Sequence, residues 1–211
     1  MTAPLSRDGF ARLTGVSRET LDRLEAYVAL LRSWNRRINL VGRATIGDVW
    51  RRHILDSWQL QAQLDPERRP LVDIGSGAGL PGLVLAILGA PAVHLIEADL
   101  RKAAFLAEAL RVTGTSAKLW PKRSDRIAPF PAAFITARAV APLPDLLDLA
   151  EPFLDTHSIC LFLKGKSVED ELTLAAKAWK MRIARLSSCS DPSGTLLRLE
   201  SLTREPRAGV G

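Results

Sequence analysis

Residues 72–82 have the sequence VDIGSGAGLPG, in which a short apolar strand ends in a glycine cluster and leads into an apolar helix. Glycines at a strand end let the backbone approach a ligand closely, because no side chain intervenes. Glu97 follows Gly75 by about 20 residues, at the expected end of the next strand, where a carboxylate can bind both hydroxyls of a ribose. The spacing therefore predicts a nucleoside-binding site at the end of a parallel sheet.

Two cofactors are compatible with these glycines. Residues 77–82 satisfy the GxGxxG pattern of dinucleotide sites, which leaves a nicotinamide-dependent oxidoreductase open. The pattern that begins at the strand, however, is Asp73-x-Gly75-x-Gly77-x-Gly79. S-adenosylmethionine (SAM) carries a sulfonium and an ammonium, so the Asp73 carboxylate would attract it and would repel a diphosphate. The spacing favours SAM over NAD.

Strands and helices alternate from residue 67 onward. We expect strands at 71–74, 93–97, 117–120, 133–136, 158–163, 181–186 and 195–202, and helices at 81–88, 100–112, 143–154 and 168–179. This order is typical of βαβ units in a mostly parallel sheet with both faces covered. Residues 187–194 are rich in turn formers, so the last two strands should form an antiparallel hairpin at the sheet edge. An α/β fold with a seven-stranded sheet follows.

The first 66 residues are expected to be helical. Ser17 can cap a helix in which Leu21, Leu24, Val28 and Leu31 form one apolar stripe. A second helix is predicted from residue 48 to 64, and residues 65–70 form a linker. We therefore divide the chain into an N-terminal helical extension, 1–66, that faces the substrate, and a nucleoside-binding core, 67–211.

Composition limits the class of protein. The chain has 211 residues, enough for one domain with a small appendage, and its net charge of +6 favours an anionic partner such as nucleic acid. Cys160 and Cys189 are too few for a disulfide framework and have no metal-ligand spacing, which indicates a reducing cytoplasm and no metal site. The sequence contains no apolar run long enough for a signal peptide or a membrane helix.

Basic residues cluster around the two N-terminal helices. The cluster consists of Arg32, Arg36, Arg37, Arg43, Arg51 and Arg52. The segment 34–40, WNRRINL, combines an aromatic ring, amides and guanidiniums, which stack on bases and bind phosphates. Arg52 and His53 are spaced to pair with Asp56 on one helix face, and an ordinary solvated helix surface explains this spacing equally well.

No residue pattern predicts a general acid, base or nucleophile. The three histidines are dispersed, and neither a nucleophile elbow nor a phosphate-binding GxxxxGK[ST] run occurs. A ring nitrogen with a free lone pair, such as guanine N7, has no proton to remove, so positioning alone can accelerate its attack on a methyl group. Arg138 and Lys164 follow expected strands, where α/β sheets bind ligands.

Taken together, several sequence blocks resemble the glucose-inhibited division protein B family, the bacterial 16S ribosomal RNA guanine-N(7)-methyltransferases. The blocks are WNxxINL at 34–40, RHILDS at 52–57, DIGSGAGLPG at 73–82, KxxFL at 102–106, RSD at 123–125, RA at 138–139 and KG at 164–165. The resemblance implies a Rossmann-like methyltransferase fold and a SAM-dependent transfer to one guanine in the decoding-site loop of 16S rRNA.

The resemblance also implies roles for individual residues. Gly75 and Leu80 would line the methionine and adenosyl pocket, Glu97 would hold the ribose, and Ser124 and Asp125 would border the adenine. The family often has a glutamate at the position of Asp125. The cofactor-binding set is then Asp73, Gly75, Gly77, Gly79, Leu80, Glu97, Ser124, Asp125 and Arg138.

For the RNA, we expect Arg138 and His53 to orient the guanine as the catalytic residues. We expect Arg36, Arg37, Arg52 and Lys164 to hold phosphates. The partner is 16S rRNA or the small ribosomal subunit, without membrane or metal, and we expect a monomer with a loose tail after Leu202. A non-catalytic rRNA-binding module stays open beside the oxidoreductase.

Overall fold

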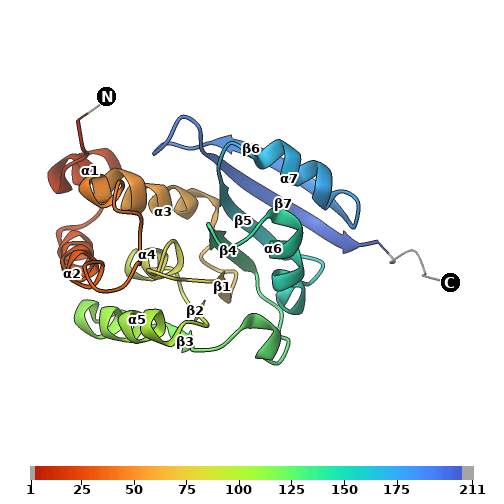
Figure 1. The fold of residues 1–211 in the computed structure, drawn as a ribbon, viewed down its shortest axis with the longest axis horizontal. Coiled ribbons are helices and arrows are strands. Elements are labelled where there is room, and N and C mark those ends of the chain that lie inside the picture. The colour runs from red at the N-terminus through yellow and green to blue at the C-terminus, as the bar shows by residue number, and fades with distance from the viewer. Residues whose placement is uncertain (1–2, 206–211) are drawn as a thin grey trace.

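The computed structural model describes residues 3–205 and contains a seven-stranded sheet in that range (Figure 1). The strands are β1 (Leu71–Ile74), β2 (Val93–Ile96), β3 (Lys118–Trp120), β4 (Phe134–Arg138), β5 (Ile159–Lys164), β6 (Trp179–Ser187) and β7 (Thr195–Arg204). Their order is β3-β2-β1-β4-β5-β7-β6. The first five strands are parallel, and β7 is antiparallel to both β5 and β6. The predicted mixed sheet and its closing hairpin are confirmed.

Helices cover both faces of the sheet (Figure 1). On one face, α4 (Gly82–Ile87) and α5 (Leu100–Thr113) pack with the N-terminal helices, and on the other lie α6 (Leu143–Ala150) and α7 (Val168–Ala175). Each face of the sheet has its own hydrophobic cluster, and alternate residues of β5 point into the two clusters. Leu161 belongs to the cluster on the side of α4 and α5, and Cys160 and Phe162 belong to the cluster on the side of α6 and α7. Cys160 is thus a buried apolar thiol, as its strand position predicts.

The N-terminal region begins with α1 (Arg7–Thr14), which the sequence pattern does not predict, followed by α2 (Arg18–Trp34). The predicted cap is present, because the Ser17 side chain accepts a hydrogen bond from the Thr20 backbone N–H. The predicted apolar stripe of α2 is buried, and Tyr27 is buried with it. These helices share one hydrophobic cluster with the sheet residues of the first face.

The helix predicted from residue 48 to 64 is a succession of short, irregular turns. It consists of η1 (Ile46–Asp48), the π-helix η2 (Trp50–Leu55), α3 (Asp56–Trp58) and η3 (Gln59–Gln63). A π-helical turn is rare and frequently occurs at functional sites. The RHILDS block lies across η2 and α3, so its side chains do not follow α-helical spacing.

Three predicted boundaries are wrong. The helix predicted to reach residue 179 ends at Ala175, and Trp179 begins β6 with its side chain buried. The helix predicted from 143 to 154 changes to the 3-10 turn η5 (Glu151–Phe153), where Pro152 cannot continue the α-helical hydrogen bonds. Strand β7 continues past Leu202, and the rest of the predicted loose tail, residues 206–211, lies outside the described residues. Within residues 3–205, no helix is long and apolar enough to cross a membrane.

Candidate functional site

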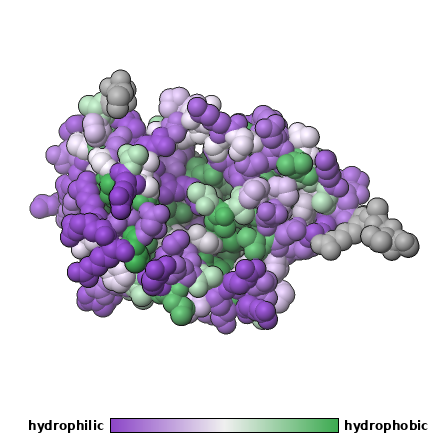
Figure 2. Space-filling view, in the orientation of Figure 1, coloured by the Kyte–Doolittle hydropathy of each residue, from purple (hydrophilic) through white to green (hydrophobic). Residues whose placement is uncertain are grey.

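A cavity of about 720 Å³ lies at the carboxyl ends of β1, β4 and β5. Its wall combines the glycine segment 75–80, the loop 138–142, residues 163–165, the helical segment 52–56 and the turn between β6 and β7. In Figure 2 the middle of the molecule is hollowed and shows hydrophobic side chains, while hydrophilic side chains surround it. Pockets of this size hold nucleotide-sized ligands, and α/β sheets bind them at this edge.

The glycine segment forms a tight loop between β1 and α4. Gly75 has φ +61°, and a Cβ atom there would lie 2.8 Å from the Val140 side chain, so only glycine fits. Gly82 begins α4 directly against Asp73, where an added Cβ would lie 2.5 Å from that side chain. Gly75, Gly77 and Leu80 line the cavity, whereas Gly79 is not among the lining residues.

Glu97 lies at the end of β2 and is 7% exposed. Its carboxylate accepts hydrogen bonds of 2.7 Å from the backbone N–H groups of Gly77 and Asp99. The acid therefore lies directly beside the glycine loop, although it does not itself line the cavity. The predicted pairing of a glycine loop with a carboxylate on the next strand is present in the structure.

Asp73 is completely buried beneath the loop rather than on the cavity wall. Its Oδ1 accepts a 2.7 Å hydrogen bond from the Thr136 hydroxyl on the neighbouring strand β4. Burial raises the pKa of Asp73 to about 6, against the opposing effect of the Thr136 hydrogen bond. Asp73 can thus act on a ligand through its charge, from below the loop.

Arg138, at the end of β4, is fixed by the N-terminal segment. Its Nη1 donates to Asp56 Oδ2 at 3.1 Å and to the Arg52 carbonyl oxygen at 3.0 Å. Asp56 also accepts a 2.6 Å hydrogen bond from the Ser190 hydroxyl, in the turn between β6 and β7. One carboxylate thereby joins the helical extension, the parallel sheet and the closing hairpin.

The expected pairing of Arg52 with Asp56 along one helix face is wrong. Arg52 Nη1 instead donates to Asp191 Oδ2 at 2.5 Å, across the cavity mouth, and Asp56 pairs with Arg138. The π-helical turn at residues 50–55 changes the side-chain spacing on which the i,i+4 expectation depends. Sequence reasoning missed Ser190 and Asp191, which lie in a segment that signals only a turn.

His53 is 5% exposed and lies on the cavity wall. Its Nε2 lies 2.9 Å from the Thr45 hydroxyl, and that hydroxyl donates to the Gly42 carbonyl oxygen at 2.8 Å. The Thr45 oxygen therefore accepts from His53, which places the imidazole proton on Nε2. Burial, with the positive charges of Arg138 and Arg52, lowers the pKa of His53 to about 3, so the ring is neutral near pH 7.

The other predicted site residues lie at different distances from the cavity. Lys164 lines it, donates to the Ala141 carbonyl oxygen at 3.0 Å and pairs with Glu171. Ser124 is buried in the 3-10 turn η4 (Ser124–Arg126), and the exposed Asp125 pairs with Arg123 at 3.2 Å; neither lines the cavity.

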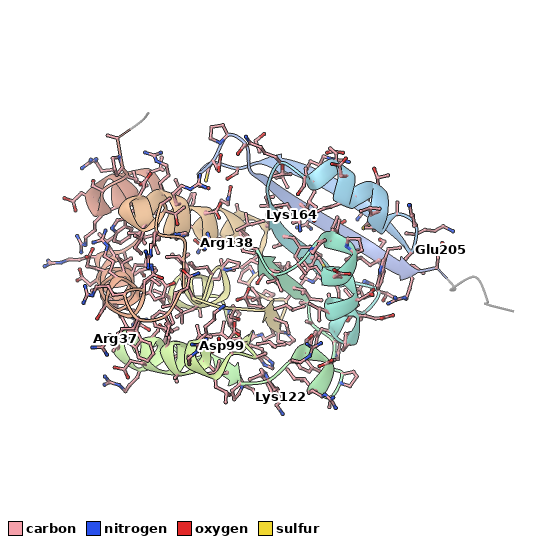
Figure 3. All side chains as sticks on the ribbon, in the orientation of Figure 1. Arg37, Asp99, Lys122, Arg138, Lys164 and Glu205 are labelled. Carbon is pink, nitrogen blue, oxygen red and sulfur yellow. The ribbon has the colours of Figure 1, made fainter. Side chains whose placement is uncertain are left out.

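The predicted RNA-binding arginines lie farther out. Arg36 and Arg37 are exposed beyond the end of α2 and have no ion-pair partner among residues 3–205. Figure 3 shows Arg138 and Lys164 near the middle of the molecule and Arg37 at its edge. Among the described residues, no group of three His, Cys, Asp or Glu side chains could hold a metal ion.

Solved structures with a similar fold include proteins that bind SAM. A mutant of MtNAS in complex with S-adenosylmethionine gives a TM-score of 0.57 at 14% identity and covers 93% of this chain and 84% of that one. The ribosomal protein L11 methylase from Lactobacillus delbrueckii subsp. bulgaricus gives 0.55 at 16% identity, covering 72% and 77%. At these identities the likeness shows the fold alone, and it confirms the predicted Rossmann-like methyltransferase fold.

Comparison of the sequence itself is more specific. The family model GidB, rRNA small subunit methyltransferase G, matches residues 20–195. The ribosomal RNA small subunit methyltransferase G of Rhodospirillum rubrum is 54% identical and covers 95% of this chain and 100% of that protein. The protein of the same name from Rhodospirillum centenum is 57% identical, covering 92% and 89%. The chain therefore belongs to the GidB family, rRNA small subunit methyltransferase G.

Proposed function

We propose that this chain transfers the methyl group of SAM to N7 of a guanine in the decoding-site loop of 16S ribosomal RNA. The observation that carries the proposal is the cavity at the carboxyl ends of β1, β4 and β5, where a glycine loop backed by the buried carboxylate of Glu97 faces Arg138 and His53. Neither an oxidoreductase nor a non-catalytic module gains support from the family to which the chain belongs.

The residues around the cavity fit SAM. Gly77 carries no side chain, and the nearest atom to a Cβ built there is a backbone oxygen 3.7 Å away, so this stretch of the loop is open to a ligand. Glu97, beside Gly77, would hold the ribose hydroxyls, and Asp73 would act on the cationic end of the ligand from below. Gly75 and Leu80 would line the pocket, and Ser124 and Asp125 would border the adenine.

The electrostatics of the site suit a positively charged methyl donor. The bound cofactor would supply an activated methyl on a sulfonium, and guanine N7 has a lone pair that needs no deprotonation. Three of the four cations on the wall are balanced by carboxylates, in the pairs Arg52–Asp191, Arg138–Asp56 and Lys164–Glu171, and the fourth, Lys102, has no ion-pair partner among residues 3–205. The wall therefore adds one unbalanced positive charge, far fewer than its four cations would, and it does not need to supply a general base.

Arg138 and His53 would orient the guanine. Arg138 uses Nη1 for both of its contacts with the N-terminal segment, so Nε and Nη2 remain for a ligand acceptor such as guanine O6. The neutral imidazole of His53 adds no charge next to the base whose ring becomes cationic. Their role is to hold N7 in line with the methyl group rather than to move a proton.

The RNA would lie over the N-terminal extension, residues 1–66. Arg36 and Arg37 are exposed there, and Arg52 and Lys164 would add phosphate contacts at the cavity mouth, where RNA phosphates compete with Asp191 and Glu171. A single copy of the chain carries every group named here, so we expect a monomer. A substrate in the small ribosomal subunit would put the enzyme in the cytoplasm.

The test is methyl transfer in vitro. Purified protein, SAM with a labelled methyl group, and 16S rRNA or small subunits from cells that lack the gene should give one labelled 7-methylguanosine per RNA. Naked RNA and assembled subunits are compared in parallel, and sedimentation gives the oligomeric state. RNA binding without transfer would indicate a non-catalytic module, and binding of NADH but not SAM would indicate an oxidoreductase.

A further inference from the structure

Tyr27 connects the N-terminal extension to the glycine loop. Its side chain is fully buried in α2, and its hydroxyl donates a 2.6 Å hydrogen bond to the carbonyl oxygen of Ala78, 51 residues away. Ala78 lies on the cavity wall, between Gly77 and Gly79. The aromatic ring is held by Phe105 of α5, with ring centroids 6.3 Å apart. Tyr27 is the only tyrosine of the chain.

The loop around Ala78 needs an external anchor. Gly77 and Gly79 have φ values of +55° and +86°, which glycine adopts freely, so steric hindrance does not fix the Ala78–Gly79 peptide unit, and the hydrogen bonds of its own N–H and carbonyl groups hold it. Two further hydrogen bonds of the loop have both partners within residues 67–211: the Gly79 N–H donates to the Ser76 carbonyl oxygen, and the Gly77 N–H donates to Glu97. The Tyr27 hydroxyl binds the Ala78 carbonyl oxygen from the side of α2.

This hydrogen bond persists over the working pH range. Burial raises the pKa of Tyr27 above its ordinary value, so the phenol stays protonated and remains a donor. Without it, the Ala78 carbonyl would be a buried acceptor with an unmet hydrogen bond, and rotation of the peptide toward the cavity would relieve that penalty. A carbonyl oxygen turned into the cavity would change the surface that meets the ligand.

We propose that Tyr27 is a positioning residue for the cofactor, which fixes the Ala78 peptide and so keeps the glycine loop in its binding shape. The N-terminal extension thereby contributes to cofactor affinity as well as to RNA binding. This inference rests on the proposed function, since it takes SAM as the ligand of the cavity.

The test is Tyr27→Phe, which removes only the hydroxyl. The dissociation constant of SAM, measured by calorimetry without RNA, should rise roughly tenfold, the equivalent of one lost hydrogen bond. KM for SAM should rise in parallel, while kcat at saturating SAM stays within about twofold, because the bound complex keeps its reacting geometry.

Ser158→Ala is the matched control. The Ser158 hydroxyl is also buried and donates to a backbone carbonyl, that of Ala132, away from the cavity. This variant should lower thermal stability at least as much, since the Ser158 hydroxyl also accepts a hydrogen bond from the Asp155 N–H, and should leave SAM affinity unchanged. An unchanged SAM affinity in Tyr27→Phe would overturn the inference, whereas wild-type protein that binds no SAM would overturn the proposed function itself.

A second measurement covers the case in which Tyr27→Phe does not fold. Incorporation of 3-fluorotyrosine labels one site, because the chain has one tyrosine, and gives a single ¹⁹F resonance. Addition of SAM should shift that resonance, since the Ala78 peptide binds the phenol and lines the cavity in which SAM would lie. A resonance unmoved at saturating SAM would contradict the proposal.

Discussion

Two buried carboxylates, Asp73 and Glu97, flank the glycine loop and have different surroundings. Glu97 accepts backbone hydrogen bonds at both oxygens, while Asp73 lies beneath the loop with a raised pKa. Acids with a raised pKa are frequent at functional sites, and a cationic cofactor would stabilise the ionised form of Asp73. Asp73 belongs to the segment 72–82 that predicts the fold, and Glu97 follows the next strand.

Glu97→Gln tests the ribose contact. The amide keeps the shape but replaces one acceptor oxygen with a donor, so the dissociation constant of SAM should rise about tenfold or more. RNA affinity should change little, because Glu97 is buried beside the loop and does not line the cavity. Glu108→Gln, an exposed acid of α5 paired with Arg111, is the control. Equal SAM affinity in wild type and Glu97→Gln would contradict the ribose assignment.

Asp73 predicts a pH dependence of stability. The carboxyl ionises near its ordinary value of 3.8 when unfolded and near 6 when folded, so the folded state binds the proton more tightly. Its contribution to stability is therefore full below pH 3.8 and is lost as pH rises through 6. Relative to wild type, Asp73→Asn should gain up to about 3 kcal/mol between pH 4 and pH 7.

Urea unfolding of both proteins across this range measures the difference between their free energies of unfolding. Groups that titrate in the same way in both proteins cancel in this difference. Parallel stability curves would show that Asp73 has no raised pKa in the folded state. The same variant should bind SAM more weakly at pH 8, where the wild-type carboxyl is ionised.

Among the helices and strands, the irregular segment η2–α3 connects the parts of the chain that form the site. Through Asp56 it holds Arg138 of β4 and Ser190 of the β6–β7 turn, and through Arg52 it holds Asp191. A regular α-helix would not place these side chains in the same directions, since π-helical turns change the angular spacing. The segment after α2, with Arg36 and Arg37, extends from this junction to the surface.

Asp56→Asn tests the junction. The amide fills the same space but removes the charge that orients Arg138, so kcat should fall roughly tenfold to a hundredfold. SAM affinity should stay near the wild-type value, because the glycine loop keeps its own anchors. Asp22→Asn, at an exposed ion pair with Arg7, is the control for loss of one acid. A kcat equal to wild type would show that the Asp56–Arg138 pair is not needed for positioning.

The exposed arginines give a prediction of their own. The double change of Arg36→Ala with Arg37→Ala should reduce the slope of log affinity for rRNA against log salt by about one for each phosphate contact. Arg12→Ala with Arg18→Ala removes the same charge from exposed positions of α1 and α2 and should leave the slope unchanged. An identical slope in the first variant would mean that the RNA does not lie on this surface.

Across the whole molecule, the sequence predicts features that depend on neighbouring residues, and it does not predict contacts between residues far apart in the chain. Strand β1, its glycine loop and Glu97 are predictable because each depends on neighbouring residues and a fixed spacing. The pairs Arg138–Asp56 and Arg52–Asp191 join residues 82 and 139 positions apart, and no local pattern signals them. Burial of Trp179 in β6 is likewise a matter of tertiary packing, whereas α1 carries local signals, a Ser6 N-cap and a left-handed Gly15 at its C-terminus, which the sequence prediction leaves unused.

The folded chain also explains why the extension and the core form one site. The helices of the first 66 residues share a hydrophobic cluster with one sheet face, and hydrogen bonds cross from them to the loop, to β4 and to the closing hairpin. Cofactor, guanine and RNA backbone would each meet a different part of this assembly. The geometry is consistent with a methyltransferase that works by positioning.

The most direct test is to map 7-methylguanosine in 16S rRNA from cells with the gene, without it, and with the gene restored. We expect one guanine in the decoding-site loop that is methylated in the first and third strains and unmodified in the second. Complementation with the Asp56→Asn variant should restore the 7-methylguanosine only slowly or in part. An identical set of 7-methylguanosines in all strains would contradict the account.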